Sequence, residues 1–139
     1  MSSVVAISGP PGSGKTTLIR RLLQHIPESS AVYIDDYECY TQQSPEQIRT
    51  WLTNGADPND FDLKELADHL GLLKTHAAAS TVPAPQGTCS DHLVFFETQF
   101  GKRHRQTGTL IDYQIWIDLP LDESLCRNLM SFLASIIGS

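Results

Sequence analysis

One eight-residue motif near the N-terminus constrains the fold more than any other feature of the chain. The segment Gly9-Pro10-Pro11-Gly12-Ser13-Gly14-Lys15-Thr16 matches the phosphate-binding pattern G-x-x-x-x-G-K-[ST]. Its glycines let the backbone curl, so that amide N–H groups point inward at phosphate oxygens, and the following helix adds unpaired amides and its dipole. An apolar run at 4–7 precedes the motif and a helical pattern follows it. The motif therefore predicts a nucleoside triphosphate site.

Individual positions of the motif have separable chemical roles. A lysine at position 15 reaches the β and γ phosphates, and the hydroxyl of a threonine at position 16 coordinates magnesium. We therefore expect ATP and Mg²⁺ as ligands. The residues expected to contact the nucleotide are Gly9, Pro10, Pro11, Gly12, Ser13, Gly14, Lys15, Thr16 and Thr17.

Short apolar segments alternate with helical patterns along the chain. Strands are predicted at 4–7, 31–34, 92–97 and 113–117, and helices at 13–25, from 44, at 63–74 and from 121. Ser44 and Gln47 fit a capping box at the start of one of these helices. This alternation is typical of an α/β fold: a P-loop NTPase-type parallel sheet sandwiched by helices, with four core strands. No linker interrupts residues 1–139, so we expect a single domain.

Every predicted strand after the first ends in acid. Asp35 and Asp36 follow the second strand, Glu97 ends the third, and Asp118 ends the fourth. Ligands of open parallel sheets bind at the carboxyl ends of the strands, where carboxylates can hold magnesium or accept a proton. For Asp35 and Glu97 we favour such a role. Asp36 is evenly balanced between a role at the site and simple capping, and Asp118 fits capping better.

The amino-acid composition disfavours some kinds of binding partner. The net charge of −6 disfavours binding to a nucleic acid polymer. The longest apolar stretch, 129–137, is too short to span a bilayer, so we expect no membrane partner. The three cysteines, Cys39, Cys89 and Cys126, form no metal-binding or disulfide pattern, and no secretory signal is visible. These features favour a cytoplasmic protein with free thiols.

The order of motifs resembles the uridine kinase-like branch of P-loop kinases. The resemblance runs from residue 3 to about 128 and rests on the P-loop, on Ile34-Asp35-Asp36-Tyr37, on Phe95-Phe96-Glu97 and on 117–122. It implies transfer of the γ-phosphoryl group of Mg-ATP to a hydroxyl of a small-molecule acceptor, such as a nucleoside or a sugar phosphate. Such enzymes act mainly through positioning and electrostatics.

The same resemblance implies roles for particular residues. Asp35 matches the acid that takes the proton from the acceptor hydroxyl, and Glu97 matches the glutamate that organises magnesium and acceptor. Asp57 falls where relatives bind the sugar of the acceptor. Tyr37 and Trp51 are candidates to stack on a base or to line the acceptor pocket, and ordinary packing as half-buried aromatics explains them equally well. The basic segment Phe100-Gly101-Lys102-Arg103-His104 resembles a segment of bacterial relatives, which makes Arg103 a candidate phosphate or substrate contact.

The chain departs from this family pattern at its C-terminal end. Relatives continue with further helices, a strand and an arginine-bearing lid, whereas Arg127 is the last basic residue here. We therefore expect the C-terminal part of the family fold to be absent, and an exposed sheet edge to favour a homo-oligomer. Two other readings remain open: a protein that binds Mg-ATP without transferring phosphate, and a P-loop NTPase with a regulatory or metallochaperone role.

Overall fold

A four-stranded parallel sheet forms the centre of the molecule. The computed structural model describes residues 2–37, 43–76 and 92–138. Strands β1 (Ser3–Ser8), β2 (Ser29–Tyr33), β3 (Leu93–Glu97) and β4 (Tyr113–Trp116) pair in the order β2-β3-β1-β4. All three pairings are parallel, so the carboxyl ends of the strands lie along one edge. The predicted parallel sheet is confirmed.

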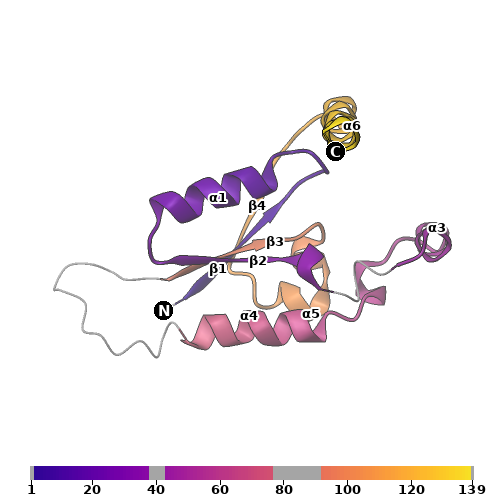
Figure 1. The fold of residues 1–139 in the computed structure, drawn as a ribbon. Coiled ribbons are helices and arrows are strands. Elements are labelled where there is room, and N and C mark those ends of the chain that lie inside the picture. Colours follow the sequence, from indigo (N-terminus) through magenta and orange to yellow (C-terminus); the bar gives the residue numbers. More distant parts are fainter. Residues whose placement is uncertain (1, 38–42, 77–91, 139) are drawn as a thin grey trace.

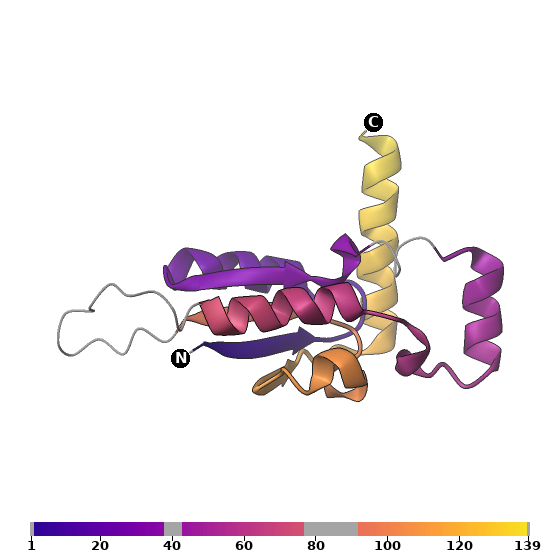
Figure 2. The ribbon, with the colours of Figure 1, turned by 90° about the horizontal axis from the view of Figure 1, so that it is seen from below.

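Helices cover both faces of this sheet. Helix α1 (Lys15–His25) lies on one face, and α4 (Lys64–His76) with the short α5 (Arg105–Gly108) lies on the other (Figure 1). Two helices stand away from the sheet: α3 (Pro45–Thr53) and α6 (Leu121–Ile137), which is clearest in Figure 2. The α/β sandwich expected from the alternating pattern is therefore confirmed.

Alternate side chains of the strands build two separate hydrophobic clusters. Successive residues of β1 point to opposite faces, so Val4 and Ala6 pack toward α4 while Val5 and Ile7 pack toward α1. The first cluster is completed by the buried residues Val32, Ile34, Leu63, Leu66, Leu70, Val94, Phe96, Phe100 and Ile111. The second contains Ile19 and Phe95. Burial on both faces explains why the two central strands, β1 and β3, are continuous apolar runs in the sequence.

Several element boundaries differ from the sequence prediction. The second strand was expected at 31–34, whereas β2 covers Ser29–Tyr33 and a 3-10 turn covers Ile34–Asp36. Ser29 and Ser30 join the strand because backbone pairing with Leu93 and Val94 of β3 does not require apolar side chains. The basic segment after β3 forms a 3-10 turn, Gly101–Arg103, before α5. The capping box at the start of α3 is present as predicted.

Asp112 joins three parts of the fold next to β4. Its Oδ2 accepts a hydrogen bond from the Val4 amide at 2.8 Å, and its own amide donates to the Val4 carbonyl at 2.9 Å. Its Oδ1 lies 2.9 Å from Nζ of Lys74 on α4. Partial burial opposes ionisation of this carboxyl, but the hydrogen bonds from Lys74 and Val4 outweigh it and lower its pKa.

Replacing Asp112 by asparagine should lower the stability of the fold in a pH-dependent way. The charged pair is partly exposed, so we expect a loss of about 0.5–1.5 kcal/mol at pH 7, measured by urea unfolding. Because the folded-state pKa lies below the ordinary value, this contribution is present at neutral pH and disappears as the pH falls through the folded pKa. The difference between wild type and Asp112→Asn should therefore shrink in acid. The exposed Asp68→Asn on α4 is the control, and an equal loss there would contradict the assignment.

Candidate functional site

The loop between β1 and α1 adopts a conformation that depends on two of its glycines. Gly12 has φ 75° and Gly14 has φ 91°, both in the left-handed region that side-chain-bearing residues avoid. Gly14 is the N-cap of α1, so the first turn of the helix opens directly from the loop. The unpaired amides of that turn therefore face the space where a phosphate would bind.

Lys15 is folded back over the loop. Its Nζ donates to the Gly9 carbonyl at 2.7 Å and to the Pro10 carbonyl at 3.4 Å, and only 9% of the residue is exposed. Burial lowers the pKa of this amine, while the negative charges of Glu97 and Asp35 oppose that decrease. Both carboxylates therefore favour the charged form of the amine, and a bound phosphate would favour it in the same way.

Thr16 and Glu97 meet although they lie 81 positions apart in the sequence. The Thr16 hydroxyl donates to Oε2 of Glu97 at 2.9 Å. Parallel pairing of β1 with β3 brings about this contact, because Ile7 is in register with Glu97 and the loop begins just after β1. Two oxygen atoms of the kind that Mg²⁺ prefers are thus placed next to the loop.

These groups line one cavity of about 470 Å³ at the carboxyl edge of the sheet. Of the predicted acidic candidates, Asp35 and Glu97 line it, and Asp36 does not. Residues that the sequence prediction left out are Gln99, Arg127 and Ser131. The complete lining is Pro11, Gly12, Ser13, Gly14, Lys15, Thr16, Thr17, Asp35, Glu97, Gln99, Arg127 and Ser131. The structure thus gathers the loop, one acid from each of two strand ends and part of α6.

Helix α6 presents its polar stripe to the loop. The Ser124 hydroxyl donates to the Pro11 carbonyl, and a Cβ on Gly12 would lie 3.1 Å from the Ser124 carbonyl oxygen and 3.2 Å from Cβ of Arg127. Arg127 also lies 3.6 Å from the Glu123 carboxylate, one turn back on the same helix. The signal for this face was present in the sequence, because Ser124, Arg127 and Ser131 share one side of a helix that is otherwise largely apolar.

The donor set of the cavity fits a phosphate group. The Ser13 hydroxyl is buried and has no hydrogen-bond partner among the described residues, although buried hydroxyls are normally paired. No cluster of three or more His, Cys, Asp or Glu side chains able to hold a metal occurs in the described part of the chain. A magnesium ion at Thr16 and Glu97 would therefore need phosphate or water oxygens to complete its ligands.

Tyr37 and Asp36 face a different cavity, of about 490 Å³, beside the edge strand β2. The Tyr37 hydroxyl is hydrogen-bonded to Nδ1 of His69 on α4. Burial, followed by the negative charges of Glu65 and Asp36, raises the pKa of Tyr37, so the phenol stays protonated at neutral pH. Tyr37 is thus not among the residues around the phosphate-binding loop, and its proposed contact with substrate remains a prediction.

Asp57 and Arg103 belong to a polar network between two 3-10 turns, Pro58–Asp60 and Gly101–Arg103. Oδ1 of Asp57 accepts from the backbone amide and from the side-chain amide of Asn59, at 2.9 and 3.0 Å. These bonds, together with the charges of Arg105 and Arg103, lower the pKa of Asp57. The Asn59 side-chain amide also donates to the Arg103 carbonyl at 3.3 Å. Neither Asp57 nor Arg103 lines the cavity at the loop.

His104, the last residue of the basic segment, is held in place by contacts within the fold. It is 1% exposed, its Nε2 lies 2.9 Å from the Phe61 carbonyl, and its Nδ1 lies 3.1 Å from the Thr107 hydroxyl. Its ring stacks on Phe100. Both nitrogens therefore have partners within the fold, and the histidine holds the segment after β3 against the turn at 58–60.

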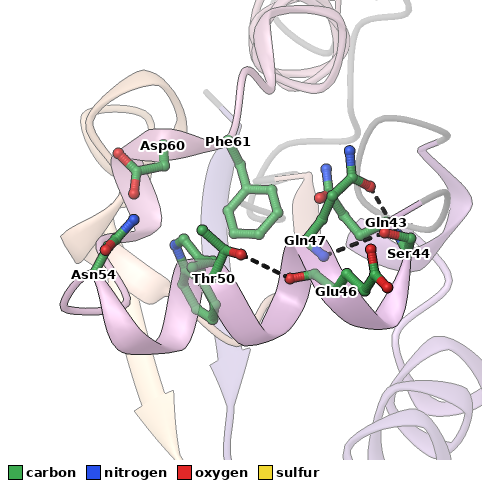
Figure 3. Close-up of a pocket in the computed structure, with 9 residues that line it drawn as sticks. Gln43, Ser44, Glu46, Gln47, Thr50, Asn54, Asp60 and Phe61 are labelled. Atoms are coloured by element: carbon green, nitrogen blue, oxygen red, sulfur yellow. Dashed lines mark hydrogen bonds between the residues drawn. The ribbon is translucent and has the colours of Figure 1, made fainter.

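A third cavity, of about 670 Å³, lies between α3 and the turn at Pro58–Asp60 (Figure 3). Trp51 packs edge-on against Phe61, and its indole N–H donates to the Asp57 carbonyl at 2.8 Å. Most of the remaining lining is polar, with amides, hydroxyls and two carboxylates. The residues are Gln43, Ser44, Glu46, Gln47, Thr50, Trp51, Asn54, Asp60 and Phe61. Such a lining suits an uncharged ligand rich in hydroxyl groups.

Comparisons with known proteins agree with this geometry. The family model described as "AAA domain" matches residues 2–112, so the chain belongs to that family. A uridine kinase of Borrelia garinii subsp. bavariensis is 27% identical over 146 residues, which cover 93% of this chain and 66% of the relative. A uridine kinase of Alkaliphilus metalliredigens is 34% identical over 73 residues, covering 50% of this chain and 34% of the relative. The resemblance to uridine kinases that the motifs indicated is thereby confirmed.

Solved structures support the fold assignment. A putative fructose transport system kinase from Silicibacter superposes with a TM-score of 0.60 at 19% identity, covering 96% of this chain and 73% of that one. At this identity the likeness concerns the fold alone. The chain spans about two thirds of the length of the first curated relatives that it matches. None of the described helices is long and apolar enough to cross a membrane.

The positive φ of Gly12 and its closeness to α6 predict that a side chain at this position destabilises the protein. Gly12→Ala places a Cβ against α6 at a positive φ, so we expect the protein to lose about 1–3 kcal/mol of stability, together with phosphate affinity. Gly71→Ala is the matched control: it lies inside α4, a Cβ there would meet nothing within 4 Å, and it should stabilise the fold by about 0.5–1 kcal/mol. Urea unfolding measures the stability of both variants. A neutral Gly12→Ala would contradict the close approach of α6 to the loop.

Proposed function

We propose that this member of the AAA domain family binds Mg-ATP at residues 9–17 and transfers the γ-phosphoryl group to a hydroxyl of a small molecule. The observation that carries the proposal is the convergence of Lys15, the Thr16–Glu97 pair and Asp35 on one cavity at the phosphate-binding loop. The similarity to uridine kinases favours a nucleoside as the acceptor.

Charge balance in the cavity suits a bound triphosphate with a metal. The cations Lys15 and Arg127 face the carboxylates Asp35 and Glu97, so the side chains alone do not neutralise a triphosphate. Loop amides, the start of α1 and a divalent ion would supply the remaining positive charge. Magnesium, when bound, screens the phosphate oxygens. Thr16 and Glu97 would hold it, since the Thr16 oxygen keeps lone pairs while its hydrogen bonds Glu97.

Asp35 is the group we assign to the acceptor hydroxyl. Its carboxylate would accept the hydroxyl proton as the acceptor oxygen bonds to the γ-phosphorus and the bond to the bridging oxygen breaks, releasing ADP. Lys15 would exchange its bonds to the Gly9 and Pro10 carbonyls for the phosphate oxygens. Arg127 would add positive charge from α6.

We assign binding of the remainder of the acceptor to the cavity beside α3. Its carboxylates and amides can hold hydroxyl groups, and the aromatic pair Trp51 and Phe61 offers a surface for a ring. Asp60 is the carboxylate that we assign to acceptor hydroxyls. Asp57, which the sequence pattern favoured, remains a candidate, but its carboxylate already accepts two hydrogen bonds from Asn59.

The first test measures ADP release from Mg-ATP with and without a panel of nucleosides, sugars and sugar phosphates. We expect one acceptor to raise the rate and Asp35→Asn to reduce that acceptor-dependent rate by about 100-fold or more, with Mg-ATP affinity nearly unchanged. Asp36→Asn is the matched control and should stay within a few-fold of wild type. If Asp36→Asn is the damaging change, the base is misassigned. If Mg-ATP binds and no acceptor has any effect, the chain is a nucleotide-binding protein without transferase activity.

A second test separates the two acids near α3. With the acceptor found above, Asp60→Asn should raise the KM for the acceptor roughly tenfold and leave kcat within a few-fold, because it removes a charged hydrogen-bond partner of the ligand. Asp57→Asn should leave that KM nearly unchanged. The reverse result would assign acceptor binding to Asp57 and to the polar network around Asn59.

A further inference from the structure

The amphipathic character of α6 is inverted relative to an ordinary surface helix. Its polar stripe, Ser124, Arg127 and Ser131, faces the phosphate-binding loop of its own domain. Its apolar residues lie on the opposite side of the helix and face away from the protein. A helix normally buries its apolar face and exposes its polar one, so this arrangement leaves the energetically costly surface in water.

The exposed apolar surface is extensive. Between 44% and 81% of each large apolar residue of α6 is accessible to solvent: Leu121, Leu125, Leu129, Met130, Phe132, Leu133, Ile136 and Ile137. Figure 2 shows why, since α6 passes the carboxyl edge of the sheet and its C-terminal half extends beyond the rest of the domain. Contiguous apolar patches of this kind mark interaction sites in soluble proteins.

Four of these side chains follow a coiled-coil repeat. Leu125, Leu129, Phe132 and Ile136 are separated by four, three and four positions, which is the alternating spacing of the a and d residues of a heptad. The repeat is symmetric about its centre. If a second copy of α6 lies antiparallel, Leu129 faces Phe132 of the copy and Leu125 faces Ile136 of the copy, and every contact occurs twice. The seam is therefore complementary to itself, as an interface with two-fold symmetry requires.

We propose that α6 pairs in antiparallel orientation with α6 of a second copy of this chain, forming a dimer through the seam Leu125–Leu129–Phe132–Ile136. The apolar surface is extensive enough for a dimer. The eight large apolar side chains of α6 are on average about two thirds exposed, and a standard stable interface buries ~800 Å² on each partner. The proposal is independent of the transferase reaction.

The charges on α6 disfavour a lipid surface as the partner that covers its apolar side. Helices that lie on membranes carry Lys and Arg on the polar side and contact anionic lipids. Here α6 has a single basic residue, Arg127, against the acids Asp122 and Glu123, and the chain carries a net charge of −6. Antiparallel pairing also sets the N-terminal end of each helix beside the C-terminal end of the other, so the helix dipoles attract.

The oligomeric state tests the pairing. Sedimentation equilibrium of the full chain from about 1 to 100 µM, the range that separates weak from stable pairs, should show a species of twice 15.4 kDa that grows no further. Leu129→Glu should raise the dissociation constant at least ~30-fold. Leu72→Glu on α4 is the matched control, since Leu72 and Leu129 are both 55% exposed, and it should leave the dimer intact. Circular dichroism would verify that both variants remain folded.

A charge pair tests the orientation. Leu129→Glu and Phe132→Lys should each be monomeric alone, whereas a mixture should form a heterodimer, because position 129 of one copy faces position 132 of the other only in the antiparallel arrangement. A wild type that stays monomeric at every concentration would overturn the proposal, as would assembly that continues past two copies. Binding of the monomer to anionic vesicles, lost in Leu129→Glu, would identify a lipid surface as the occupant instead. A dimer that survives Leu129→Glu would place the interface elsewhere.

Discussion

The parallel pairing of β3 with its two neighbours, β1 and β2, brings the strand-end groups of the candidate site together. It sets Glu97 in register with Ile7, so that the carboxylate reaches the start of α1 and accepts the Thr16 hydroxyl. The pairing of β3 with β2 aligns the end of β2 with the same edge, so that the loop and Asp35 project into one cavity. Two apolar clusters hold the sheet between α1 and α4, so the loop and the strand ends are supported by the packed core.

The elements around the sheet differ in how much of their surface packs against the core. The loop and the strand ends rest on buried strands, whereas α3 contains no buried residue and is joined to the body mainly through Trp51 and Phe61. Helix α6 contacts the loop through Ser124 near its first turn and then leaves the domain. Nucleotide-binding groups thus sit on the core, and the groups assigned to the acceptor and to a second copy sit on the elements that project from it.

Helix α6 links the site to the outer surface of the molecule. One face supplies Arg127 and Ser131 to the cavity, and the other carries the apolar seam. Whatever covers the seam would also fix the position of Arg127 relative to the loop, because both belong to one rigid helix. The helix is therefore the element through which assembly and phosphate binding would be coupled.

Local patterns in the sequence predicted the loop, the parallel sheet and much of the core. Each pattern, whether a β-branched run, a glycine turn or a helical repeat, depends only on residues close together in the sequence. They also made Lys15, Thr16, Asp35 and Glu97 the predicted site residues, since a P-loop and acidic strand ends suit phosphate and magnesium. Only the tertiary structure separated Asp35 from Asp36, adjacent residues that turn to different cavities within the 3-10 turn after β2. The tertiary structure alone also brought Arg127 to the loop and left the apolar side of α6 exposed. The face that a helix buries depends on the element that packs against it, and local sequence does not specify that neighbour.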